Sequence, residues 1–321
     1  MKIIDAHHHF WDPVRHYYPW LCDEGHPPHR YGDHSSLKRP YLPADYRRDT
    51  SAFELAGSVY MEADWDPRDP VGEMRFIESL RKHSGLPSVA IGQAWLHQDD
   101  AESTLEQLAA FDFVRGIRQK PRANASANDS APGGMTDPAW RRGHALLERH
   151  GFHYELQTPY WHLHEAAVVA RDFPGTRIVI NHTGMPSDRS ADGLAAWRKA
   201  MVGMAECPNV AVKISGIGLA GKRWTVQENR PVVLDTIDIF GTDRCMFASN
   251  FPVDGMCASF ETIFTGFAEI VSGFTPLEQR ALFYNNARQI YRIPAQQANT
   301  ELPDAEDAKD SQRTQKKTQG D

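Results

Sequence analysis

The sequence contains few cysteines and none at metal-binding spacing. Its four cysteines, Cys22, Cys207, Cys245 and Cys257, are scattered and form no Cys-x-x-Cys pair. They indicate neither a disulfide framework nor a sulfur-ligated zinc site. No apolar stretch reaches the roughly 18 residues of a membrane span, and no segment of the signal-peptide kind opens the chain. We therefore expect a cytoplasmic protein without a membrane partner.

Basic side chains are also fewer than acidic ones, with 35 Lys and Arg against 42 Asp and Glu. The 321 residues carry a formal net charge of −7 and a sequence pI near 6.1. No overall basic surface is available for a phosphate backbone, so we expect no nucleic-acid partner. A Gly-rich nucleotide turn is absent as well, which argues against an open, doubly wound sheet.

The pattern that is present alternates strands with helices. Eight short apolar or β-branched runs cover residues 2–9, 56–63, 88–96, 113–119, 152–157, 177–182, 210–215 and 245–250. Amphipathic stretches with three- and four-residue apolar spacing lie between them, at 72–83, 104–111, 140–151, 164–173 and 194–206, and a further one follows at 276–291. Eight strands that each lead to a helical segment predict an α/β fold, the (β/α)8 or TIM barrel, over residues 1–294.

Three segments do not fit the alternation. Residues 16–47, rich in Pro, His and Tyr, predict a long loop directly after the first strand, of the kind that forms lids or binding loops. Residues 120–138 predict a second loop. Residues 295–321 are polar and lack aromatic side chains, and they predict a disordered C-terminal tail.

Active sites of such barrels lie at the carboxyl ends of the strands. Nearly every predicted strand ends in polar side chains, and these are His7, His9, Glu62, Gln93, Arg118, Glu155, Gln157, His182, Lys213, Ser215 and Asn250. Eight polar strand ends that meet at one rim predict a pocket equipped for chemistry.

Three consecutive histidines end the first strand. Side chains of a strand alternate between its faces, so His7 and His9 should share the barrel interior, whereas His8 should face the surrounding helices. Two imidazoles at i and i+2 can bind one divalent cation, zinc above all, with His182 as a third ligand. Alternatively, the histidines bind the substrate directly and the site is metal-free.

Five ordered motifs carry a family resemblance: IDAHHHFWD (4–12), VRGIRQK (114–120), INHTGMP (180–186), VKISG (212–216) and MFASNFPVD (246–254). In this order and spacing the chain resembles, over residues 2–293, the amidohydrolase superfamily and its lactonase group, which acts on sugar, pyrone and muconolactone rings. The resemblance implies that His7 and His9 take the family's His-x-His place, His182 its pocket histidine and Arg118 an anion-gripping position. It leaves the metal open, since some members hold one zinc and others none.

One position departs from the family pattern. The last strand of the superfamily normally ends in an aspartate that accepts a proton from water, and this chain has Asn250 there. An amide cannot serve as that base, although it can orient water. The proton acceptor is then Asp254, Glu155, Glu62 or His182. Asp254 either folds back over the rim or is a solvated loop residue.

The functional hypothesis is a hydrolase that opens a lactone or similar cyclic ester of a small carboxylic acid. Arg118 and Lys213 would hold a small anionic substrate by its carboxylate, with Glu62 and Gln157 completing the substrate-binding set. Tyr160 and His182 would stabilise charge on the carbonyl oxygen. The alternatives are a non-hydrolytic member of the superfamily, a decarboxylase or hydratase, and a carboxylate-binding protein without activity. Homo-oligomerisation is left open.

Overall fold

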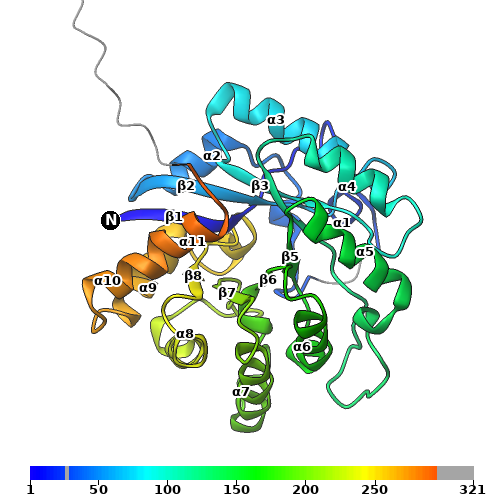
Figure 1. Cartoon of the computed structure of the whole chain (residues 1–321). Coiled ribbons are helices and arrows are strands. Elements are labelled where there is room, and N and C mark those ends of the chain that lie inside the picture. The colour runs from blue at the N-terminus through cyan, green and yellow to red at the C-terminus, as the bar shows by residue number, and fades with distance from the viewer. Residues whose placement is uncertain (26–28, 295–321) are drawn as a thin grey trace, which may run out of the picture.

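The computed structural model of the protein describes residues 1–25 and 29–294. Eight parallel strands follow one another in chain order around the sheet (Figure 1). They are β1 (Lys2–His8), β2 (Glu54–Met61), β3 (Val89–Gln93), β4 (Val114–Arg118), β5 (His153–Leu156), β6 (Ile178–Ile180), β7 (Val210–Ile214) and β8 (Cys245–Phe247). All eight predicted strands are present, so the (β/α)8 barrel is confirmed.

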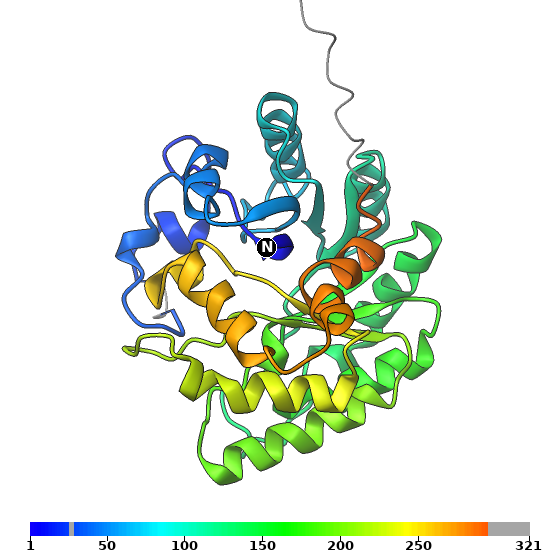
Figure 2. The ribbon, with the colours of Figure 1, turned by 90° about the vertical axis from the view of Figure 1, so that its left-hand side faces the viewer.

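Helices surround the strands (Figure 2). The main ones are α3 (Gly72–Ser84), α4 (Ala101–Ala109), α5 (Pro138–Arg149), α6 (Leu163–Asp172), α7 (Ala191–Ala205), α8 (Val226–Phe240) and α9 (Phe260–Ile270). The chain then continues through α10 (Pro276–Arg280), a π-helical turn (Ala281–Asn285) and α11 (Asn286–Ile290). Ser190, Thr225, Ser259 and Thr275 cap α7 to α10 by accepting a backbone N–H. The periodicity did not predict α8, which contains Pro231 and so lacks one helical hydrogen bond.

The first and last strands meet where the barrel closes. The Asn250 amide N–H donates to the His7 carbonyl over 2.8 Å, and the His9 amide N–H donates to the Phe251 carbonyl over 2.7 Å. These two bonds bring the histidines of β1 beside the segment that follows β8. The closure therefore places motifs from the two ends of the sequence at one rim.

Apolar side chains fill the barrel below that rim. Ile4, Val59, Ile91, Val179 and Met246 form a buried cluster inside the sheet. Tyr291, just after α11, belongs to the same cluster, so the C-terminal helices close the bottom of the barrel. A larger cluster packs the helices against the outer face of the strands. The core thus leaves the carboxyl ends of the strands as the place for a site.

The described residues of the segment after β1 contain helices that the sequence did not predict. Within residues 16–47 lie α1 (Pro19–Cys22), a 3₁₀ turn (Ser35–Leu37) and the beginning of α2 (Pro43–Asp49). Prolines at the first turns of α1 and α2 suit helix starts, which the prediction of a plain loop overlooked. The predicted tail, 295–321, lies outside the described residues. In the part of the chain that the structure describes, no helix is long and apolar enough to cross a membrane.

Candidate active site

The three histidines at the end of β1, His7 and His8 within it and His9 just after it, separate as the alternation argument predicted. The ring centroid of His7 lies 5.1 Å from that of His9 and 4.7 Å from that of His182. His8 points the other way and stacks on Tyr46, with ring centroids 4.3 Å apart. The sheet register shifts between Asp5 and His8; such irregularities are common beside active sites, where they re-aim side chains.

Hydrogen bonds fix two of the three inward-facing rings. The Nδ1 of His9 lies 2.9 Å from the Met61 carbonyl, which can only accept, so Nδ1 carries the proton and Nε2 has a free lone pair. The Nδ1 of His182 lies 2.9 Å from the Ser215 hydroxyl, which can donate or accept. Neither ring nitrogen of His7 has a partner among the described residues.

Burial keeps all three rings neutral. It lowers the pKa of His7, His9 and His182 well below 6.5, and nearby cations lower it further. Lys213 acts in this way on His7, Arg118 on His9 and Arg30 on His182. Neutral imidazole is the form that binds metal or exchanges hydrogen bonds with a substrate.

Neutral imidazole nitrogens are suitable ligands for a divalent ion, but the three rings are not arranged as a metal site. Tetrahedral zinc holds nitrogen ligands at about 2.0–2.1 Å, which places them about 3.3 Å from one another. Across residues 1–25 and 29–294, no group of three or more His, Cys, Asp or Glu side chains is arranged to hold a metal ion. A zinc centre at His7, His9 and His182 stays a prediction.

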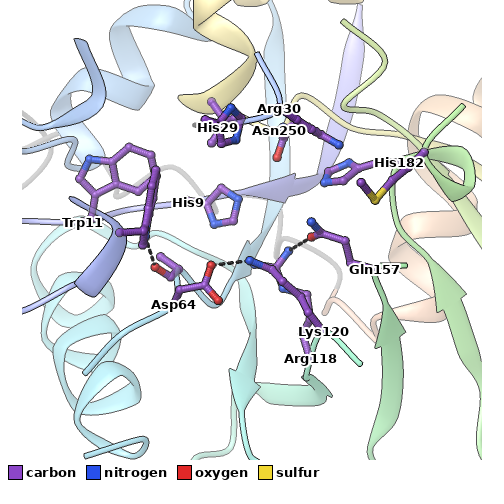
Figure 3. Close-up of a pocket in the computed structure, with 14 residues that line it drawn as sticks. His9, Trp11, His29, Arg30, Asp64, Arg118, Lys120, Gln157, His182 and Asn250 are labelled. Carbon is purple, nitrogen blue, oxygen red and sulfur yellow. Dashed lines mark hydrogen bonds and ion pairs between the residues drawn. The ribbon is translucent and has the colours of Figure 1, made fainter. Parts of the chain in front are cut away.

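A cavity of about 290 Å³ opens at the carboxyl ends of the strands (Figure 3). Its lining includes two tryptophans, Trp11 and Trp20, whose rings meet at right angles 5.3 Å apart. Both indole N–H groups donate to backbone carbonyls, that of Trp11 to Arg39 over 2.9 Å and that of Trp20 to Ala63 over 2.8 Å. The indole rings are therefore fixed, and they give the cavity a rigid apolar side.

Arg118 lines this cavity but is already paired. Its Nε bonds the Glu62 carboxylate, and one terminal nitrogen donates to the Glu62 carbonyl over 2.5 Å. The other donates to the Gln157 side-chain oxygen over 3.0 Å. The structure thus brings together three predicted substrate-binding residues, and Glu62 compensates the charge of Arg118 without a substrate.

Five predicted site residues do not themselves line the cavity, and these are Lys213, Tyr160, His7, Glu62 and Asp254. Lys213 is fully buried and its ammonium lies 2.8 Å from the Glu155 carboxylate, which also accepts from the Tyr291 hydroxyl. Burial lowers the pKa of Lys213 to about 8. Burial raises the pKa of Glu155, but Lys213 and His153 together outweigh it and hold that pKa at about 2. The predicted contact of Lys213 with substrate is replaced by an ion pair beneath the cavity.

Asp254 folds back to the rim, so the alternative of a solvated loop aspartate is wrong. It is 1% exposed, and its Oδ1 accepts from the Asn250 side-chain amide over 2.6 Å and from the Tyr31 hydroxyl over 3.1 Å. Burial raises the pKa of Asp254 to about 6. Asn250 itself lines the cavity and has a left-handed backbone with φ of 56°, which asparagine tolerates better than most residues.

Sequence reasoning missed Arg30. It lies in the segment after β1 and lines the cavity near His182 and Asn250 (Figure 3). The composition of residues 16–47 indicated a binding segment, but no periodicity or motif singled out one residue within it. Only the path of the chain over the rim shows which side chain enters the cavity.

A (β/α)8 barrel with a His-x-His pair at the end of its first strand, a histidine after its sixth and a cavity beside them is typical of an amidohydrolase type of protein. The chain belongs to this family, because the family described as Amidohydrolase matches residues 4–293. The resemblance read from the five motifs is confirmed.

Individual relatives cover almost the whole chain. The protein y4mH of Sinorhizobium fredii is 39% identical over 91% of this chain and 99% of its own length. An L-fucono-1,5-lactonase of Burkholderia ambifaria is 26% identical over 90% of this chain and 95% of its own. An amidohydrolase from Burkholderia multivorans, solved with bound zinc, has a TM-score of 0.74 at 24% identity and covers 92% of this chain and all of its own.

Proposed function

We propose that the protein is a hydrolase that opens a lactone or similar cyclic ester of a small carboxylic acid. The observation that carries the proposal is the Asp254 carboxyl, which Asn250 joins to a cavity beside neutral histidines. The similarity to an L-fucono-1,5-lactonase along nearly the whole chain supports the lactone as the substrate class.

The reaction adds water across one ester bond. The water oxygen attacks the carbonyl carbon, the bond from that carbon to the ring oxygen breaks, and the ring oxygen takes up a proton. The product is a hydroxy acid, which releases one proton at neutral pH. The chain must therefore hold the water, accept its proton and stabilise the charge on the carbonyl oxygen.

Asp254 is the best proton acceptor of the four candidates. Glu62 and Glu155 are paired with Arg118 and Lys213, and burial makes His182 a weak base. Asp254 has no such cation within 4.0 Å among the described residues, and its pKa is raised to about 6 by burial. A base of that pKa is matched to reaction near neutral pH.

Asn250 and two histidines hold the reactants. Because the Asn250 amide nitrogen donates to Asp254, its side-chain oxygen remains to accept from the attacking water. The other hydrogen of that water is left for Asp254, and the Nε2 lone pair of His9 can accept from a hydroxyl of the substrate. When the Ser215 hydroxyl donates to Nδ1 of His182, Nε2 of that ring carries a hydrogen for the carbonyl oxygen.

A divalent ion such as zinc at His7, His9 and His182 would add Lewis-acid polarisation of the carbonyl. The ligand geometry for it is not formed in the described residues, and we propose that the chain's own groups suffice. A small-molecule substrate remains the proposed partner.

The test is a panel of lactones read by acid release with a pH-indicator dye. The panel includes L-fucono-1,5-lactone and 2-pyrone-4,6-dicarboxylate, and we expect a kcat/KM of about 10⁴ M⁻¹ s⁻¹ or more for at least one member. Release of carbon dioxide from an aromatic carboxylate without lactone opening would favour the decarboxylase alternative. Binding of the hydroxy acids without any turnover would favour a binding protein.

A further inference from the structure

Three cationic side chains line the cavity, and two of them are neutralised within it. Arg118 pairs with the buried Glu62, and Lys120 pairs with Asp64, which lines the same cavity. Arg30 has no carboxylate within 4.0 Å among the described residues. Among the described lining residues, its guanidinium is therefore the one cation outside a salt bridge, although its charge lowers the pKa of the buried Asp254.

Arg30 lies at the reacting end of the cavity. A Cβ atom on Gly216 would fall 2.4 Å from the Nδ1 of His182 and 2.6 Å from a terminal nitrogen of Arg30. The imidazole and the guanidinium therefore approach the same glycine, whose missing side chain makes room for both. Gly216 has φ of 59°, a left-handed conformation that also favours glycine. Figure 3 shows Arg30 beside Asn250 and on the same side of the cavity as His182.

We propose that Arg30 stabilises the negative charge that develops on the carbonyl oxygen of the lactone and then holds the carboxylate of the hydroxy-acid product. The inference rests on the proposed function and deepens it. A guanidinium is planar and presents several N–H donors, which suits one oxygen of a tetrahedral intermediate and both oxygens of a carboxylate. Arg30 thereby takes the anion-binding part that the sequence assigned to Arg118.

The pairing of Arg118 and Lys120 within the cavity also favours an uncharged substrate. A lactone that carries a carboxylate in addition to its ester would place a negative charge in the cavity. Arg118 and Lys120 could not compensate that charge, because they are already paired with Glu62 and Asp64. An unpaired charge in such a site is costly. A neutral hydroxylated lactone has no such cost, because its hydroxyls can bond the side chain of Gln157 and its ring carbons can lie against Trp11. The substrate class is therefore a neutral lactone of a polyhydroxy acid.

The experiment compares Arg30→Gln and Arg30→Lys with Arg39→Gln, a matched change at an exposed arginine of the same segment. We expect Arg30→Gln to lower kcat for L-fucono-1,5-lactone by about 100-fold or more, as loss of an oxyanion donor does, and to change KM by less than about threefold. Inhibition by the open-chain L-fuconate should weaken about tenfold or more. Arg30→Lys should recover part of kcat, and Arg39→Gln should match the parent enzyme.

Two results would overturn the inference. One is that Arg30→Gln leaves kcat and product inhibition unchanged. The other is that the parent enzyme prefers 2-pyrone-4,6-dicarboxylate and that Arg30→Gln raises KM for it alone, because Arg30 would then bind a remote carboxylate. Failure of the proposed function looks different: the parent enzyme would open no lactone of the panel. Unchanged melting temperatures in all three variants would show that the effects are not losses of fold.

Discussion

The side-chain amide of Asn250 donates to the carboxylate of Asp254 over 2.6 Å, and this pair stands where the family has one aspartate. The carboxyl group is thereby moved behind an amide that faces the cavity. Asn250 lines the cavity and Asp254 does not, so the acid is buried, and burial raises its pKa to about 6. The pair can hold a water molecule and accept its proton with two residues instead of one.

His8 gives a prediction about stability rather than activity. Its ring is fully buried on Tyr46, and burial lowers its pKa to about 3. Since the unfolded chain binds the proton near pH 6.5 and the folded one does not, stability falls as pH drops from 6.5 toward 3. His8→Phe keeps the ring and removes the titration, so its advantage over the parent should grow by about 2 kcal/mol between pH 7.5 and pH 5.

Urea unfolding at the two pH values measures this difference, and activity at pH 7.5 should be kept. His7→Ala and His9→Ala are the matched controls: they should abolish turnover while leaving the fold intact. Equal loss of activity in all three variants without any change in unfolding would show that His8 also serves the reaction.

Arg118 and Glu62 give a prediction about a buried ion pair. Arg118→Met leaves the Glu62 carboxylate buried without its partner, which should cost about 3–5 kcal/mol of unfolding free energy. Adding Glu62→Gln removes the unpaired charge and should restore much of that loss. A loss below about 1 kcal/mol, together with a selective defect toward a carboxylated lactone, would mean that Arg118 serves the substrate as the sequence predicted.

Metal removal tests the histidine cluster. Because the described residues form no group of three metal donors, we expect treatment with EDTA and gel filtration to change kcat/KM by less than about twofold. Metal analysis of the active fractions should find well under one zinc per chain. A large loss that zinc restores in the parent, and not in His7→Ala, would show that His7, His9 and His182 converge on an ion.

Much of this architecture could be predicted because periodicity and strand ends are local signals. The eight strands, the inward faces of His7 and His9 and the outward face of His8 follow from apolar runs and alternation. Which side chains pair with one another at the strand ends depends on residues that are far apart in the sequence. That Glu62 rather than a substrate holds Arg118 depends on which neighbours share the rim. Arg30 could not be found at all, since its position depends on the path of a segment without period.

The acid limb of the pH profile should report Asp254. As a base it works when deprotonated, so kcat/KM should rise with pH through about 6, the value to which burial raises its pKa. Asp5 is also buried with a pKa of about 6, but it bonds Ser249 and Tyr46 away from the cavity. Asp254→Asn should therefore flatten the limb, and a limb that survives this change would assign the proton to another group.

A double-mutant cycle on Asn250 and Asp254 decides how the proton is handled. Asp254→Asn alone should lower kcat/KM by about 100-fold or more, the usual contribution of a general base. Asn250→Asp alone places a second carboxylate 2.6 Å from the first, so the two raise each other's pKa and the acid limb moves to higher pH. In that background Asp254→Asn should cost much less, because the new aspartate can accept the proton, so the loss in the double mutant should be smaller than the sum of the two single losses. If Asn250→Asp instead raises lactone hydrolysis strongly and Asp254→Asn changes nothing, Asp254 is not the base, and the natural amide points to the non-hydrolytic alternative.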